Sequence, residues 1–169
     1  MVLLFNDKSN ARPAGPNYAA IRYKRKGGTT MLEIRHISKR DQSFWLTLDK
    51  DFCTHEFKRK VRDKRGYVIS ARGKPIGVMR YNLLWDNTPF LTLIYIEESY
   101  HGKGYGRQAM EFWEREMRTL GYQMVMTSTR VDEEAQHFYR KLGYIDRGGV
   151  FLDRTPLEQA QEMFMIKIL

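Results

Sequence analysis

A glycine-rich run of ten residues, His101 to Met110 (HGKGYGRQAM), constrains the fold of this 169-residue chain more than any other segment. The preceding residues, Phe90 to Ile96, are apolar, β-branched and aromatic, as a buried strand requires. After the run, apolar residues recur at helical spacing until a glycine that would end the helix: Met110, Trp113, Met117, Leu120 and Gly121. The run is therefore predicted to join a buried strand to the first turn of an amphipathic helix.

A glycine-rich turn of this kind favours a bound phosphate. Glycine lets the backbone approach an anion without a Cβ clash, and the free N–H groups lie at the positive end of the helix dipole. Lys103 and Arg107 would add positive charge. The alternative is an ordinary strand-to-helix loop, because glycine-rich phosphate motifs produce false matches.

Length and composition indicate one globular domain. The hydrophobic content of 42% and charged content of 29% are ordinary for such a domain. No apolar run approaches the ~20 residues that a membrane-spanning helix needs. The first residues lack a secretory pattern, and a single cysteine, Cys53, excludes an internal disulfide. We therefore expect a cytoplasmic protein with no membrane partner.

The net charge of +9 is concentrated at the start of the chain. Residues 1–30 contain six Lys or Arg side chains against Asp7, a net of +5, so the remaining residues carry only +4. Prolines, glycines and the lack of periodicity predict that residues 1–30 form a flexible basic extension, with the folded domain at 31–169. The charge alone does not make nucleic acid an expected partner.

Periodicity and turn residues predict an α+β fold. A strand comes first, then two short helices, the first capped by Ser38 and Asp41, and then three antiparallel strands. The glycine-rich turn and its helix, a fifth strand, a helix from Asp132 to Gly143 and two final strands follow. The predicted strands lie at about 31–37, 67–71, 76–84, 90–96, 124–129, 144–152 and 163–169, and the second short helix at about 54–64.

Two segments together resemble the GNAT superfamily of N-acyltransferases. Ile94 to Gly106 (IYIEESYHGKGYG) is similar to the acyl-CoA motif of that family, Arg or Gln, two residues, Gly, one residue, Gly or Ala. Gly104 and Gly106 match, whereas His101 stands where Arg or Gln is usual. About 30 residues on, Asp132 to Tyr144 (DEEAQHFYRKLGY) is similar to the family's fourth conserved segment, with Asp132 in place of Asn. The resemblance covers Met31 to about Tyr144.

The resemblance implies a GNAT-like fold for residues 31–169, with a central mixed, mostly antiparallel sheet and helices on both faces. The fourth and fifth strands of this domain, 90–96 and 124–129, would splay apart at one end. The pantetheine arm of acetyl-CoA would pair with the backbone of Ile94 and Ile96, and the pyrophosphate would lie on the amides of Gly102 to Arg107. The implied cofactor-binding residues are Ile94, Tyr95, Ile96, His101, Gly102, Lys103, Gly104, Tyr105, Gly106, Arg107 and Asp132.

The implied activity is transfer of the acetyl group of acetyl-CoA to a primary amine of a small molecule or protein, by direct attack within a ternary complex. Tyr139 is the implied general acid, which would protonate the leaving thiolate. Packing beside Phe138 is the other reading of Tyr139, but Phe138 fits the apolar stripe of its helix and Tyr139 does not. We assign no general base. Glu97, Asp86 and a water chain remain candidates.

No spacing of His, Cys or carboxylate residues fits a metal site, so we predict no metal. The segment Gly104-x-Gly106-x-x-Ala109, with Asp132 downstream, also fits a dinucleotide fingerprint. Antiparallel strands ahead of it and too little chain after it count against that reading. A non-enzymatic module that binds acyl-CoA, nucleic acid or protein is the remaining alternative.

The acceptor stays open at this stage, because it would be bound by variable segments near 39–66 and 144–162. Small amines, polyamines, amino acids, aminoglycoside-like drugs and protein N-termini or lysines are all compatible with the sequence. A basic run at 58–65 weakens the case for a polycationic acceptor, although it equally fits a solvated helix face. The oligomeric state, a homodimer included, is also open.

Overall fold

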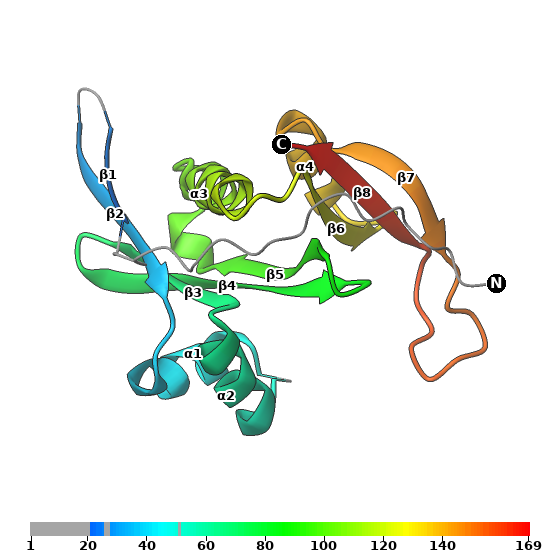
Figure 1. The fold of residues 1–169 in the computed structure, drawn as a ribbon, viewed down its shortest axis with the longest axis horizontal. Helices are drawn as coiled ribbons and strands as arrows, with labels where there is room; N and C mark the ends of the chain where they lie inside the picture. Colours follow the sequence, from blue (N-terminus) through cyan, green and yellow to red (C-terminus); the bar gives the residue numbers. More distant parts are fainter. Residues whose placement is uncertain (1–20, 26–27, 51) are drawn as a thin grey trace.

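The computed structural model of this chain describes residues 21–25, 28–50 and 52–169 (Figure 1). The elements of the first half are β1 (Ile21–Arg25), β2 (Gly28–His36), the 3-10 turn η1 (Lys39–Asp41), α1 (Gln42–Leu48), α2 (Thr54–Asp63), β3 (Gly66–Ala71), β4 (Lys74–Leu84) and β5 (Thr88–Ile96). Those of the second half are the 3-10 turn η2 (Glu98–Tyr100), α3 (Tyr105–Thr119), β6 (Met124–Arg130), α4 (Ala135–Lys141), β7 (Ile145–Val150) and β8 (Glu162–Ile168).

The described strands form one sheet in the order β1-β2-β3-β4-β5-β6-β8-β7. Neighbouring strands are antiparallel except β5 and β6, which are parallel. The parallel pair is connected through α3, the crossover that two parallel neighbours require. The predicted mixed, mostly antiparallel sheet is confirmed.

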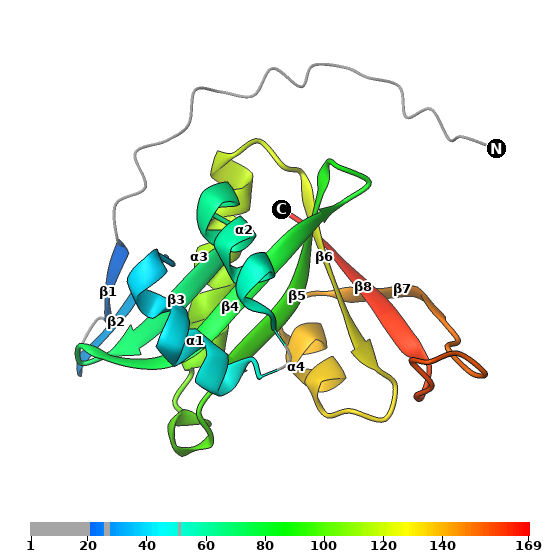
Figure 2. The same ribbon diagram turned by 90° about the horizontal axis from the view of Figure 1, so that it is seen from below.

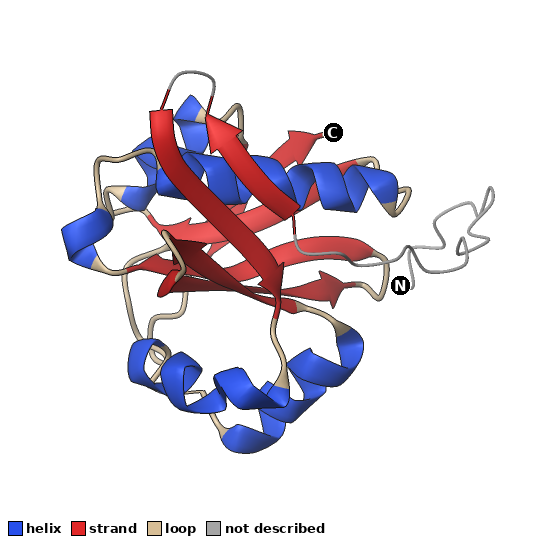
Figure 3. Ribbon diagram, turned by 90° about the vertical axis from the view of Figure 1, so that its left-hand side faces the viewer, coloured by secondary structure: helices blue, strands red, loops and turns tan. Residues whose placement is uncertain are grey.

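Helices cover both faces of the sheet, as expected from the sequence (Figures 1 and 3). On one face the apolar stripe of α3 is fully buried, with Met110, Trp113 and Met117 at 0% exposure. On the other face Trp45 of α1 and Phe57 of α2 pack in a separate apolar cluster over β3 and β4. The sheet therefore has a hydrophobic core on each side. None of the helices in the described residues has the length and apolar character needed to cross a membrane.

The sheet begins earlier than the sequence predicted. β1 pairs antiparallel with β2, and β2 starts at Gly28, so residues 21–25 and 28–30 belong to strands although we expected a flexible extension there. The five-residue β1 is short and rich in Lys and Arg, as edge strands often are, and its apolar alternation is too brief to stand out. Residues 1–20 lie outside the described residues, so their flexibility stays a prediction.

A buried carboxylate joins β2 to the start of the first helical segment. Asp41 accepts hydrogen bonds from both terminal nitrogens of Arg35, at 2.6 and 2.8 Å. The backbone N–H and the hydroxyl of Ser38 each donate to Asp41 Oδ2 at 2.8 Å. The predicted pairing of Ser38 with Asp41 is confirmed, and Arg35 adds a bidentate ion pair to it.

A buried lysine fastens α2 to the sheet. Lys60 is 5% exposed, and its ammonium group donates to the carbonyl oxygen of Tyr81 at 2.7 Å and also contacts Asn82 Oδ1. Burial, together with the charges of Arg80 and Arg65, lowers the pKa of Lys60 to about 8. The basic run on α2 is therefore not entirely a solvated face, because one of its lysines is structural.

We predict that Asp41 makes the free energy of unfolding depend on pH in the acid range. Burial raises the pKa of Asp41, but the donors Arg35 and Ser38 outweigh it and hold the pKa at about 2, against 3.8 ordinarily. A lowered folded-state pKa means that the stabilisation is complete above about pH 4 and is lost as the pH falls towards 2. The Asp41→Asn variant should have a lower free energy of unfolding than the wild type at pH 7. This difference should shrink by about 2 kcal/mol between about pH 4 and pH 2.

Urea unfolding followed by circular dichroism at each pH measures this deficit. Asp146→Asn is the matched control, because its exposed ion pair with Arg140 should be worth less than about 1 kcal/mol. A deficit of Asp41→Asn that stays constant over this acid range would contradict the prediction.

Candidate active site

The sheet forks between β5 and β6. The two parallel strands pair only at Phe90 with Met126 and at Leu91 with Thr127. Beyond these pairs they diverge, and α4 lies between their separated ends (Figure 2). The predicted splay between segments 90–96 and 124–129 is thus confirmed.

A β-bulge opens the fork. In the β4–β5 ladder Leu91 pairs with Tyr81, but Leu93 pairs with Arg80, so Thr92 is an extra residue on β5. A bulge bends the strand that carries it. Arg80 fixes the extra residue, because its guanidinium donates to Thr92 Oγ1 at 2.8 Å. The bend begins directly after the last β5–β6 pair.

The bulge leaves part of the β5 backbone without a strand partner. Glu97 N–H donates to the carbonyl of Ile76 at 2.9 Å, so alternate residues of β5 bond to β4 and the backbone groups of Ile94 and Ile96 point to the opposite edge. At that edge β6 has already departed. One of these groups has a side-chain partner, since His101 Nε2 donates to Ile96 O at 2.7 Å.

The glycine-rich run opens α3, as predicted. Gly102 and Gly104 have φ of +71° and +79°, a left-handed conformation that glycine adopts without steric cost. Gln108 N–H donates to Gly104 O at 3.1 Å, which closes the first helical turn. The preceding amides, Tyr105 to Arg107, have no acceptor within the helix and lie at the positive end of its dipole.

A cavity of about 640 Å³ lies between β5, this turn, α3 and α4. Eight of the predicted cofactor-binding residues line it: Ile94, Ile96, His101, Gly102, Gly104, Tyr105, Gly106 and Arg107. Tyr100, Glu134, Ala135, Phe138 and Tyr139 complete the lining. Ala135 and Phe138 stand three residues apart on α4, so their shared face was a signal for the site that we did not use.

Three other predicted cofactor-binding residues do not line this cavity. Tyr95 is 38% exposed, because the strand alternation turns it away from Ile94 and Ile96. Lys103 lies on the far side of the turn, where its ammonium donates to Ser99 O at 2.6 Å. Asp132 is exposed and pairs with Arg130 at 3.2 Å.

Tyr139 lies at the base of the fork and is 6% exposed. Burial raises the pKa of its phenol, and a hydrogen bond with Thr127 partly offsets this. Thr127 Oγ1 also donates to Leu91 O at 3.2 Å, at the last β5–β6 pair. Tyr139 is buried more deeply than the half-buried Phe138, the reverse of the sequence-based assignment, because α4 lies between the diverging ends of β5 and β6 and Tyr139 faces the base of the fork.

A smaller cavity of about 370 Å³ adjoins the first, and both are lined by Ile94, Ala135 and Tyr139. Two carboxylates, Glu133 and Glu162, are among its lining residues. The other described residues around it are Phe90, Leu91, Thr92, Leu93, Thr127, Ser128 and Thr129. This cavity therefore combines hydroxyl groups, carboxylates and the Tyr139 side chain.

The two carboxylates differ in their contacts. Glu133 accepts from Thr129 Oγ1 at 2.9 Å and pairs with Arg130 Nε at 3.1 Å. Glu162 contacts the side-chain amide of Gln159 at 3.0 Å and forms no ion pair within the described residues. The base candidates from the sequence, Asp86 and Glu97, line neither cavity.

Glu162 escaped the sequence analysis because the last strand was predicted to begin one residue later, at Met163. In the structure Glu162 is the first residue of β8 and pairs with Arg130 of β6 in the ladder. Among the described residues, no three His, Cys, Asp or Glu side chains converge to hold a metal ion. Cys53 is exposed and stands just before α2.

Comparison with known proteins defines the class. Residues 31–144 match the model of the acetyltransferase (GNAT) family. The chain belongs to this family, and it is an acyltransferase. No curated protein sequence matches it.

Solved structures show the same fold at low identity. Ard1 from Thermoplasma volcanium is 17% identical, with a TM-score of 0.71 over 82% of this chain and 97% of that one. Arabidopsis thaliana Naa50, in complex with the bisubstrate analogue CoA-Ac-MVNAL, is 9% identical with a TM-score of 0.69, over 82% and 99% of the chains. Spermidine/spermine N-acetyltransferase SpeG from Vibrio cholerae is 16% identical with a TM-score of 0.67, over 81% and 92%.

We predict that Gly104→Ala weakens binding of acetyl-CoA by about tenfold or more, because a left-handed alanine is strained and the turn would reorient its amides. Gly73→Ala is the matched control. It has a φ of +78° against +79°, and an added Cβ at either position meets no atom closer than 3.9 Å.

Both variants should lose about 1–2 kcal/mol of stability, but only Gly104→Ala should bind acetyl-CoA more weakly in calorimetry. Equal affinities in the two variants would show that the turn does not hold the donor.

Proposed function

We propose that this acyltransferase carries the acetyl group of acetyl-CoA to a primary amine, by direct attack within a ternary complex. The observation that carries the proposal is the fork in the sheet. It leaves the backbone of Ile94 and Ile96 accessible between the glycine-rich turn and Tyr139. The adjoining smaller cavity contains Ile94 and Tyr139 but no residue of the glycine-rich turn.

The residues of the larger cavity fit a coenzyme A thioester. The amide groups of a pantetheine arm can add to a strand edge as a peptide strand does, and β5 offers such an edge at Ile94 and Ile96. A diphosphate is suited to the N-terminus of α3, where Arg107 adds charge. The volume of about 640 Å³ lies within the range of ligand sites. Naa50, which shares the fold, is bound to an analogue that contains CoA.

His101 has a positioning role in this proposal. Its ring holds the carbonyl of Ile96 at 2.7 Å and thereby fixes the end of β5 against the glycine-rich turn. His101 stands where the family usually has Arg or Gln, and it supplies a donor from that position to the strand. The backbone groups of Ile94 and the N–H of Ile96 are then left for the donor.

Bound acetyl-CoA supplies an acetyl group on a thioester. As the amine nitrogen bonds to the acetyl carbon, the carbon–sulfur bond breaks and Tyr139 gives its phenolic proton to the departing sulfur. The phenol is protonated at neutral pH, as a proton donor must be, because the pKa of Tyr139 lies above the ordinary tyrosine value. Proton return from solvent restores the phenol.

The amine must lose a proton before or during attack, and we assign that proton to Glu162. It lines the smaller cavity together with Tyr139 and forms no ion pair within the described residues. Glu133 is the weaker candidate, because Thr129 and Arg130 already occupy its carboxylate. An uncompensated carboxylate next to the reacting amine is what a general base requires.

The acceptor in this proposal is a small molecule or a protein amine that enters through the smaller cavity. Glu133 and Glu162 favour a cationic amine there. The similar solved structures include Naa50 bound to the bisubstrate analogue CoA-Ac-MVNAL and a spermidine/spermine N-acetyltransferase, so the fold does not select between a peptide and a small amine. A library of amines, assayed for release of free CoA, tests the choice.

We predict that Tyr139→Phe lowers kcat by about 10²–10⁴-fold, because the leaving sulfur loses its proton donor. The affinity for acetyl-CoA should stay within about twofold. Tyr144→Phe is the control, since Tyr144 is also buried and its ring lies 5.6 Å from that of Tyr139, but it lines neither cavity.

Steady-state kinetics and calorimetry on the same preparations separate the two effects. If Tyr139→Phe turned over at the wild-type rate, the general-acid assignment would fail. If wild-type protein bound acetyl-CoA but acetylated no amine in the library, the chain would be a binding module and not an enzyme of this kind.

We also predict that Glu162→Gln lowers kcat by about tenfold or more, because the attacking amine loses its proton acceptor. Glu158→Gln, in the exposed loop before β8, should behave as wild type. A variant Glu162→Gln with unchanged kcat and a raised KM would instead assign Glu162 to acceptor binding and contradict the base role.

A further inference from the structure

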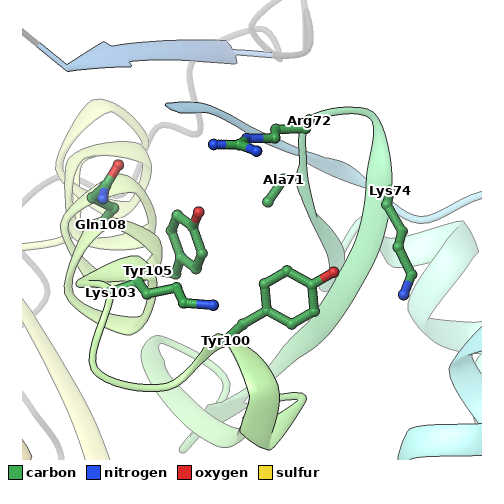
Figure 4. A pocket seen from close by; sticks show the side chains of 7 residues that line it. All are labelled: Ala71, Arg72, Lys74, Tyr100, Lys103, Tyr105 and Gln108. Atoms are coloured by element: carbon green, nitrogen blue, oxygen red, sulfur yellow. The ribbon is translucent and has the colours of Figure 1, made fainter. Parts of the chain in front are cut away.

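A third hollow, of about 600 Å³, lies on the other side of the glycine-rich turn from the larger cavity, which is called the donor cavity from here on. Figure 4 shows the side chains that line the hollow. It forms where the β3–β4 turn, the η2 segment and the first turn of α3 meet. The described residues that line it are Ala71, Arg72, Lys74, Tyr100, Lys103, Tyr105 and Gln108. Neither the proposed transfer reaction nor the family assignment uses this hollow.

Three of these lining residues are cationic, and none has an acidic partner. Within the described residues, Arg72, Lys74 and Lys103 form no ion pair with a carboxylate. Three cations elsewhere that pack against the protein do have one: Arg35 pairs with Asp41, Arg80 with Asp49 and Lys167 with Glu114. The hollow therefore holds uncompensated positive charge.

Aromatic rings form one wall of the hollow. The ammonium of Lys103 lies 5.0 Å from the centre of the Tyr100 ring and that of Lys74 lies 5.8 Å from it. The rings of Tyr100 and Tyr105 are 6.3 Å apart. Both tyrosines also line the donor cavity, so they separate the two spaces. Such a wall can stack against a flat ring of a ligand.

Arg72 points into the hollow at a conformational cost. It occupies the two-residue turn between β3 and β4 with a φ of +50°, followed by Gly73 at +78°. Asn is the residue that such a turn accommodates more readily than Arg. Figure 4 shows the guanidinium of Arg72 extending from the turn towards α3, over the ring of Tyr105.

We propose that this hollow binds a compact phosphate ester with at least two negative charges, such as a nucleoside diphosphate, at a site separate from the donor diphosphate. Three cations attract an anion of that charge, and guanidinium and ammonium groups are common phosphate ligands. The volume fits a ligand of nucleotide size, and the tyrosines offer a surface for its base. Because cations from two segments distant in sequence, the β3–β4 turn and the glycine-rich turn, line one hollow, a compact ligand fits better than a polyanion laid along the surface.

Calorimetry with ADP tests the proposal. The protein is first loaded with a single equivalent of CoA, which fills the donor cavity without excess. ADP should then bind, and Arg72→Asn or Lys74→Gln should each weaken it by about tenfold, the effect of one lost charged hydrogen bond. Arg72→Asn should not lower the melting temperature, since Asn suits the turn.

Arg154→Asn is the matched control, because Arg154 is also an exposed arginine with a positive φ, +57°, but it lies in the loop between β7 and β8. It should bind ADP as wild type does. Absence of ADP binding to the CoA-loaded protein at millimolar concentration would overturn the proposal, as would equal binding by Arg72→Asn and wild type. Binding of an RNA oligonucleotide without any binding of ADP would overturn it too, and would point to a polyanion instead.

Discussion

The extra residue at Thr92 is the constraint on which the site depends. It bends β5 away from β6, and the α1 side of the sheet holds it in place. Arg80 donates to Thr92 Oγ1 at 2.8 Å and pairs with Asp49 at 2.8 Å, and Asp49 in turn accepts from the indole of Trp45 at 3.2 Å. Trp45 is fully buried, so this chain of contacts ties the bulge to one hydrophobic core. The cluster below the sheet therefore shapes the cleft above it.

The opposite face holds the candidate active site, and the geometry of that site depends on how closely two helices approach. A Cβ on Gly106 would lie 3.4 Å from Phe138 Cζ, at the edge of ordinary van der Waals contact, so α3 and α4 lie close together beside the larger cavity. That approach carries Tyr139 to the base of the fork, beside Thr127. The bulge at Thr92 and the close approach of α3 to α4 at Gly106 thus both border the fork between β5 and β6.

Patterns that are complete within a short window were predictable, and those that depend on register between distant segments were not. The glycine-rich turn, the stripe of α3 and the pairing of Ser38 with Asp41 each fit within one element, and the structure has all three. Glu162 enters the site only because β8 aligns with β6 at Arg130, a pairing across some thirty residues. β1 escaped notice because an edge strand needs little apolar alternation.

The position of Lys103 shows that the turn separates its backbone amides from its lysine side chain. The sequence put Lys103 on the donor diphosphate because charge and glycine stood together. In the structure the turn directs its backbone amides towards the donor cavity and this side chain to the other side, where the ammonium meets Ser99 O and the ring of Tyr100. In the proposed function, donor recognition relies on fixed backbone dipoles and Arg107, and no side-chain ordering at Lys103 is needed. The Lys103 side chain instead adds to the positive electrostatic potential of the third hollow, which Arg72 and Lys74 also line.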